Sequence, residues 1–579
     1  MGIGIALPSK IRGKGREPTA PESWLGLTRD ILRDARGREL ENQSRAIEER
    51  LRYGKTASRE PGIPLLREVA SSRLSGRGDA SDGVTASEQG LRGFLRLMKA
   101  DRFPEALRYA RNAGYDRALL KGCADPAELD LRAEAAVYYG QNLVYTGGLE
   151  EARAVLQNTI ETVTRLNARE DLSPERGLDP GNWRRNLALG RAYNVLGYLC
   201  YLELGQYRRA LRLFEAALPY FEASDHVEEL ANTGQNMGIV YSLRGEGNKA
   251  TARLDEALEI RQALGLPYRI ALSREAYARA YIEAGQPHRA RIVGEQAYDA
   301  CKELNARRGV GLTAVTVGRA YHGLAMLTTV YDDRKRLEHE CRAVKLLEEA
   351  RDIFANQVFE PIRSIEALLA LGQGYSNLAL FPGSGEGIAR ERQRRALACL
   401  GEAVDLARDG HPVHFVSACI EMARHHLQTQ GSDQVAAWLK RAEEVIPQTY
   451  RLRAGGTADD DPDGEPVDEF WRQAGEIEMI RGHFAFDRVT RDGACDSFRE
   501  AAWQAIPCYA WAFAQWHRFQ GSTLEHRGRG GEIVARLRLG SMDDLEYVRE
   551  TIFPQVELRV GRLYDLPELL EHTPLLARK

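Results

Sequence analysis

Small and apolar residues recur at three- and four-residue spacing in paired runs along most of this chain. In the clearest pair, Gly238 and Tyr241 share one helical face of the first run, and Ala250 and Leu254 continue the spacing in the second. Gly245 separates the two runs, as a residue that tolerates positive φ does where a helix ends. The pattern predicts a hairpin of two helices whose small residues let the backbones approach closely.

The hairpin pattern repeats with a period of forty residues. A tyrosine, a glycine and two alanines recur at equivalent places in three successive copies: Tyr201, Tyr241 and Tyr281; Gly205, Gly245 and Gly285; Ala210, Ala250 and Ala290; Ala217, Ala257 and Ala297. A fixed period of this size marks one supersecondary unit copied along the chain. We therefore expect an array of helical hairpins instead of a single globular core.

The spacing of these residues resembles that of the tetratricopeptide repeat. That family's pattern asks for a small residue, an aromatic one, a glycine, an alanine, a large apolar residue and a second alanine, which here are Gly238, Tyr241, Gly245, Ala250, Leu254 and Ala257. Weaker copies extend the resemblance over residues 88–520, about nine hairpins in all. The resemblance implies an all-α fold, a right-handed superhelical solenoid of antiparallel helix pairs. The period exceeds the family's usual thirty-four residues and is similar to the long-repeat variety of kinesin light chains and bacterial sensor arrays.

Three segments are expected from the extent of the repeat. Residues 1–87 form an N-terminal extension, part helical and part mobile, residues 88–520 form the array, and residues 521–579 form a helical cap over its end. Asp459 to Glu469 holds seven acids and no base, which is typical of a solvated linker, with docking of a basic partner as the alternative. Within the array, Gly294 stands where the repeat asks for a bulky residue.

Composition is typical of a soluble chain with a large interior. Of its 579 residues, 43% are hydrophobic and 28% charged, and the formal net charge is −3. A nearly neutral chain lacks the field that captures nucleic acid or an anionic membrane, and no apolar run reaches the roughly 18 residues of a membrane span. The eight cysteines are scattered singly, as buried thiols are in a reducing compartment. We expect a cytoplasmic protein without membrane contact, and nucleic acid is an unfavoured partner.

The resemblance also implies a concave groove lined by the first helix of each pair. Aligning the copies places ten residues in this groove: Gln141, Tyr145, Leu199, Gln235, Ile239, Ser242, Glu275, Arg279, Gln373 and Asn377. Amides can bond a peptide backbone while apolar positions form pockets, so the set suits an extended peptide or a helix. The Lys and Asn that grip a terminal carboxylate in chaperone adaptors of this family are replaced, for example by Val137 and Gln141.

The main hypothesis is a scaffold or sensor that binds a protein or peptide in this groove. Long arrays of this variety also resemble the sensor halves of bacterial signal-transducing ATPases and transcription activators, so a regulatory subunit of such a system is the alternative. A weaker alternative is a nucleic-acid binder that uses basic residues of the array, namely Arg208, Arg209, Arg392, Arg394 and Arg395.

Candidates for chemistry are few. One cluster holds residues of metal-ligand type, namely His411, His414, Cys419, Glu421, His425 and His426, but the His-Glu-x-x-His spacing of zinc enzymes is missing. No nucleophile elbow occurs, and Gly54-Lys55-Thr56 lacks the upstream glycine of a phosphate-binding loop. We expect no enzyme activity, no cofactor and no metal.

Tryptophans gather near the end of the array. Trp503, Trp511 and Trp516 fall within fourteen residues, and one helix cannot bury all of them in the same direction. Packing between the last hairpin and the helices that follow is one interpretation. A partner-binding hot spot, where tryptophan is enriched, is the other.

Overall fold

A computed structural model describes residues 86–115, 126–169, 183–223, 226–327, 332–381, 385–429, 432–450, 467–491, 497–520 and 540–561, with isolated positions between 533 and 568. Within these residues all regular structure is helical. The chain from Arg77 to Lys579 forms one compact unit. Apart from its last two residues, the expected N-terminal extension lies outside the described part.

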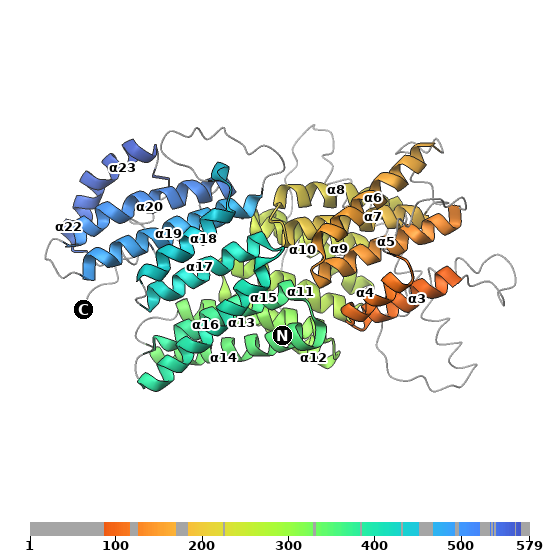
Figure 1. Cartoon of the computed structure of the whole chain (residues 1–579), viewed down its shortest axis with the longest axis horizontal. Coiled ribbons are helices and arrows are strands. Elements are labelled where there is room, and N and C mark those ends of the chain that lie inside the picture. The colour runs from red at the N-terminus through yellow and green to blue at the C-terminus, as the bar shows by residue number, and fades with distance from the viewer. Residues whose placement is uncertain are drawn as a thin grey trace, which may run out of the picture. The chain divides into compact units, whose positions relative to one another are not determined.

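The helices follow one another as pairs, and each helix packs most closely against its neighbour in the chain (Figure 1). The first helices of the pairs are α3 (Ala86–Lys99), α5 (Pro126–Thr146), α7 (Trp183–Leu202), α9 (Val227–Leu243), α11 (Pro267–Glu283), α13 (Arg307–Leu327), α15 (Pro361–Ala379), α17 (Pro412–Gln428) and α19 (Asp468–Arg491). The second helices are α4 (Phe103–Asn112), α6 (Leu149–Arg169), α8 (Tyr207–Ala223), α10 (Gly247–Ala263), α12 (Pro287–Glu303), α14 (Asp333–Asp352), α16 (Glu386–Arg408), α18 (Ser432–Val445) and α20 (Ser497–Gln520). The predicted all-α solenoid of antiparallel helix pairs is confirmed.

Short elements complete this order. A π-helix, η2 (Ile353–Val358), continues α14, and a 3₁₀ turn, η3 (Gln448–Tyr450), follows α18. Beyond α20 the chain forms α22 (Met542–Tyr547), η4 (Val548–Ile552) and α23 (Phe553–Val560). Buried residues of these last three elements share one hydrophobic cluster with α20. The helical cap over residues 521–579 stays a prediction.

Small residues on the first helix set how closely each pair packs. A Cβ atom added to Gly238 would lie 2.8 Å from Cγ of Leu254, nearer than non-bonded carbons come. The same contact of a glycine with a large side chain recurs in other pairs: Gly140 with Leu156, Gly197 with Phe214, Gly318 with Leu347, and Gly372 with Leu400. The repeat's pattern of small and large positions is therefore a packing rule between two facing helices.

The departure at Gly294 has a local explanation. A Cβ added there would lie 2.9 Å from Cγ2 of Val317 and 3.4 Å from Cβ of Ala278. Val317 belongs to α13, the first helix of the next pair, so its side chain takes the space that a bulky residue of α12 fills elsewhere. The volume is conserved although the residue that supplies it changes.

The turn glycines of the repeat adopt a left-handed conformation that other residues avoid. Gly245 has φ of 76° and Gly285 has φ of 66°. We expect Gly245→Ala to lower the free energy of unfolding by about 1–2 kcal/mol, because an alanine Cβ clashes with the backbone at positive φ. Urea denaturation measures the change.

Gly247→Ala is the matched control for that substitution. Gly247 begins α10, and a Cβ added there meets no atom within 4 Å. Alanine at this position should leave stability unchanged or raise it by up to about 1 kcal/mol, since it restricts the unfolded chain. Equal losses at positions 245 and 247 would contradict the role assigned to the turn.

Distant pairs also touch one another. α19 lies against α8, where the amide of Glu469 donates to the carbonyl of Gly205 at 3.1 Å (Figure 1). Asp468 accepts the backbone N–H of Arg208 at 3.0 Å and so caps the start of α8. Asp468 and Glu469 are buried, which differs from the solvated linker expected for the acidic run, because both carboxylates find donors on α8. The rest of that run, up to residue 466, lies outside the described residues.

Candidate functional site

The first helices form a wall with almost no exposed side chains. We call the surface made by α5, α7, α9, α11, α13, α15 and α17 the inner wall. No residue of α9 or of α15 is exposed. Each of these helices packs against its own second helix and against the first helices of adjacent pairs, which covers several of its faces. Contacts between helices, and not exposed side chains, therefore identify a candidate site on this wall.

An arginine–glutamate pair joins three parts of the inner wall. Arg308, at the start of α13, donates from Nε and Nη2 to the carboxylate of Glu360, which precedes α15, at 2.8 and 2.9 Å. Its guanidinium lies 4.7 Å from the ring centre of Tyr145 on α5. Burial disfavours the charged form, but the carboxylate of Glu360 outweighs this and raises the pKa of Arg308. The cation is therefore permanent in the interior of the array.

A second arginine connects α15 to α7. Arg363 donates to the hydroxyl of Tyr198 at 2.9 Å and to the carboxylate of Glu366 at 2.6 Å. Tyr198 and Arg363 are 165 residues apart in sequence, so the contact joins distant repeats. We call the six bridging side chains the cross-wall network, namely Tyr145, Tyr198, Arg308, Glu360, Arg363 and Glu366.

The network predicts a pH dependence of stability. Burial would raise the pKa of Glu366, but Arg363 and Arg279 overcome it and lower the value from 4.5 to about 2. A lowered pKa in the folded state stabilises the fold above the unfolded value, and this contribution is lost as pH falls from about 4.5 towards 2. Wild type should therefore exceed Glu366→Gln in urea midpoint at pH 7, with the gap closing below pH 4.5. A gap independent of pH would contradict the ion pair.

The histidines considered as metal ligands divide between separate partners. His411 lies 3.3 Å from Glu203 through Nδ1, and His425 lies 2.7 Å from the hydroxyl of Ser376. Burial, with the neighbouring His426 adding to it, lowers the pKa of His425 to about 4, so this ring is neutral at physiological pH. In the described part of the chain, no three His, Cys, Asp or Glu side chains converge in a way that could hold a metal ion.

The ten groove candidates occupy two kinds of environment. Leu199, Ile239, Ser242 and Glu275 are buried by the chain itself. The other six are half-buried: Gln141, Tyr145, Gln235, Arg279, Gln373 and Asn377. A role of these residues in partner binding stays a prediction.

Contacts within the chain already occupy several of the half-buried candidates. Gln141 donates to the hydroxyl of Tyr145 at 3.0 Å, and Asn377 donates to Glu340 at 2.9 Å. Gln235 accepts a hydrogen bond from Arg261. The structure therefore brings together Gln141 with Tyr145, and also Glu275 with Arg279 at 4.0 Å, while the remaining candidates contact other side chains.

Most of the cross-wall network carries no signal in the sequence pattern. Arg308, Glu360 and Arg363 lie at or near helix starts, where the repeat pattern assigns no characteristic residue. Arg308 and Glu360 are 52 residues apart, and Arg363 lies 165 residues from Tyr198. Helix periodicity carries no signal for contacts at that separation. Only a charged residue at a position that faces other helices could have indicated such a contact.

The three tryptophans take part in packing within the chain to different degrees. Trp516 is fully buried, and its indole N–H donates to the carbonyl of Arg472 at 3.2 Å. Trp503 is half-buried and donates to the hydroxyl of Tyr547 on α22 at 3.3 Å. Trp511 is also half-buried. The hot-spot role stays a prediction, and for Trp516 it would require α19 and α20 to separate.

The buried thiols are poor nucleophiles. Burial raises the pKa of Cys301 and Cys419 to about 12 and that of Cys399 to about 11. A thiol with so high a pKa remains protonated at neutral pH, and the thiolate is the reactive form.

The arginines weighed for nucleic-acid binding all have partners within the chain. Arg208 pairs with Asp468 at 3.2 Å, and Arg394 and Arg395 pair with Glu391. Arg209 donates to Gln206, and Arg392 donates to the carbonyl of Leu378.

Among the described helices, none combines the length and the apolar character that crossing a membrane requires.

The fold and the inner wall define a helical repeat protein. The profile of the tetratricopeptide repeat matches residues 229–303, which hold helices α9 to α12. Residues 229–303 therefore match the tetratricopeptide repeat, as the spacing of their small and aromatic residues predicts. The likeness of the chain to the long-repeat variety stays a prediction. No curated protein sequence matches this chain.

Solved structures with similar helical arrays are distant from this chain. A Rap protein in complex with competence and sporulation factor is 12% identical, with a TM-score of 0.47 over 74% of this chain and 99% of its own. The apo form of RapI is 12% identical, with a TM-score of 0.42 over 76% and 99%. Aspartyl phosphate phosphatase F from Bacillus subtilis is 13% identical, with a TM-score of 0.38 over 73% and 95%. At such identities and TM-scores these likenesses carry no argument about function.

Proposed function

We propose that this repeat array is a scaffold that binds a protein or an extended peptide at its inner wall. The fold supports the general role, since stacked helix pairs offer a long surface without requiring a catalytic centre. The choice of the inner wall rests on its chemistry. Half-buried amides and an arginine lie on first helices of several pairs, where apolar residues would pack at lower cost.

The observation that carries the proposal is the state of Gln373 on α15. Its side chain is half-buried, and no hydrogen bond joins it to another side chain of the described residues. Asn377, one turn further along the same helix, points its amide to Glu340 and His322. An amide that is half-buried and has bonding capacity to spare suits a peptide backbone, which needs both donors and acceptors.

The cross-wall network sets a condition on this binding. A partner that enters deeply between α7 and α15 must replace the bond of Arg363 to Tyr198, because a buried guanidinium that loses one of its acceptors is left with an unsatisfied donor. A partner that stays at the half-buried amides avoids this cost. We therefore place the contact at Gln373, Asn377 and Arg279, with the network left intact.

Capture experiments with matched variants test the proposal. The full-length chain is immobilised, and proteins retained from a lysate of the native organism are quantified by mass spectrometry. Gln373→Arg should abolish retention of a specific protein, because the longer charged side chain blocks the amide site. Gln262→Arg is the control, since Gln262 is exposed on the second helix α10. The proposal is contradicted if no protein is retained, or if both variants retain the same proteins equally.

A further inference from the structure

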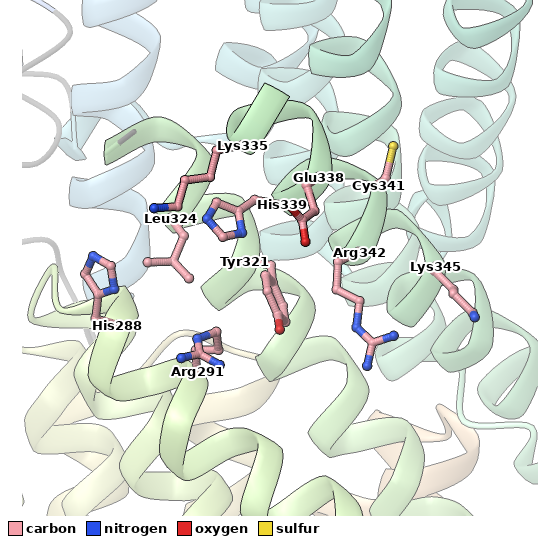
Figure 2. A pocket seen from close by; sticks show the side chains of 10 residues that line it. All are labelled: His288, Arg291, Tyr321, Leu324, Lys335, Glu338, His339, Cys341, Arg342 and Lys345. Atoms are coloured by element: carbon pink, nitrogen blue, oxygen red, sulfur yellow. The ribbon is translucent and has the colours of Figure 1, made fainter. Parts of the chain in front are cut away.

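A hollow of about 700 Å³ lies on the side of the array formed by second helices. Its walls are α12 and α14, and the end of α13 forms its floor (Figure 2). The residues that line it are His288, Arg291, Tyr321, Leu324, Lys335, Glu338, His339, Cys341, Arg342 and Lys345. Six of these ten are basic or histidine, and one is acidic.

The cations of the hollow are poorly neutralised. Lys335, Arg342 and Lys345 are exposed, and no carboxylate of the described residues pairs with any of them. Arg291 alone has such a partner, Glu295 at 2.7 Å. Burial lowers the pKa of His339; the charge of Glu338 opposes this shift, and the charges of Lys335 and Arg291 add to it.

The basic residues are spread along α14 at helical spacing. Lys335, Glu338, Arg342 and Lys345 are three or four residues apart and share one face of α14. At a rise of 1.5 Å per residue, Lys335 and Lys345 are about 15 Å apart along the axis. One phosphate or carboxylate cannot reach across that span. An extended peptide can, because alternate side chains on one face repeat every 7 Å or so.

The floor of the hollow adds an apolar component. Leu324 is buried and Tyr321 is half-buried between α12 and α14. Figure 2 shows Tyr321 between His288 and Arg291 on one side and Arg342 and Lys345 on the other. A peptide with spaced carboxylates can therefore pair with the cations while its carbon atoms pack against Tyr321. Nucleic acid fits less well, because Glu338 interrupts the cations and the chain has a net charge of −3.

We infer that this hollow binds an acidic segment of a partner protein, four or five residues long with alternating carboxylates. The inference goes beyond the inner-wall function proposed above, because it concerns another surface and another chemistry. The carboxylates pair with Lys335, Arg342 and Lys345, and the backbone of the segment lies over Tyr321. The two surfaces would let the array hold one partner at two places, or two partners at once.

Fluorescence anisotropy with the full-length chain tests the inference. The probe is a fluorescein-labelled peptide of six glutamates. The double substitution Arg342→Glu with Lys345→Glu should weaken its binding by about tenfold, because attraction turns into repulsion at two positions. Arg394→Glu with Arg408→Glu makes the same change in charge at exposed positions of α16, outside the hollow, and should stay within about twofold of wild type.

The remaining outcomes decide against the inference. It is overturned if wild type does not bind the probe, or if both double variants weaken binding equally. If sodium phosphate at the same total charge as the peptide displaces the probe, the hollow is a small-anion site. If a six-nucleotide DNA strand binds with the same affinity as the peptide, the hollow is a nucleic-acid site. Gln373→Arg should leave binding of the probe unchanged, so this result is separable from the inner-wall proposal. Circular dichroism confirms that each variant is folded.

Discussion

We expect that replacing Arg308 by methionine lowers the free energy of unfolding of the array by about 3–5 kcal/mol. The substitution leaves Glu360, which is 1% exposed, without its bidentate partner. The remaining arginine, Arg363, lies 3.7 Å away and replaces only part of the interaction. Removing one member of a buried pair costs far more than the pair contributes, because the other charge stays desolvated. Urea denaturation measures the loss.

Two further variants separate a buried charge effect from general damage. Arg308→Met combined with Glu360→Leu removes both charges and should recover most of the lost stability. Arg351→Met breaks an exposed pair with Glu402 and should cost less than about 1 kcal/mol. Since repeat arrays can unfold in segments, hydrogen exchange of α13 and α15 reports where the fold opens. If Arg308→Met costs no more than Arg351→Met, the cross-wall network does not hold these helices together.

Trp516→Ala is expected to destabilise the last hairpin by about 3–5 kcal/mol. The side chain is fully buried between α19 and α20, where Gly475 leaves space for the indole ring. Its indole N–H satisfies the carbonyl of Arg472, so the substitution leaves a cavity and also removes a hydrogen bond. Thermal unfolding followed by tryptophan fluorescence, together with hydrogen exchange of α19 and α20, measures the effect.

Trp511→Ala is the comparison for that variant. Trp511 lies on the same helix but is half-buried, so its replacement should cost about 1–2 kcal/mol. The pair also tests the hot-spot hypothesis. If Trp511→Ala reduces partner capture without loss of stability, this tryptophan contacts the partner. A Trp516→Ala protein as stable as wild type would show that the last hairpin does not depend on this ring.

The inner wall stabilises the array and also carries the proposed partner-binding site. The cross-wall network holds α5, α7, α13 and α15 together, and the proposed partner contact at Gln373 lies on one of these helices. Charged pairs of this kind contribute less to stability than apolar packing would, but they have strict geometry. Such geometry keeps distant repeats in one arrangement, which a surface that recognises a partner requires.

The repeat could be predicted from the sequence because the contacts that define it lie within one hairpin. Gly245 ends a helix since only glycine adopts its φ easily, and Gly238 faces Leu254 because both lie in one hairpin. Each such relation spans fewer than about forty residues and recurs in several copies. The pairing of helices and the all-α class therefore followed from spacing alone.

The sites depended on the tertiary structure for the opposite reason. Arg363 meets Tyr198, and Asp468 meets Arg208, only because the stack returns distant repeats to one place. The burial of Leu199 and Glu275, and the hollow between α12 and α14, follow from the same packing. A single sequence determines the shape of each hairpin, since one turn and one pair of faces suffice. Which side chains remain available to a partner is decided by how all the hairpins stack, because small rotations between pairs add up along the chain.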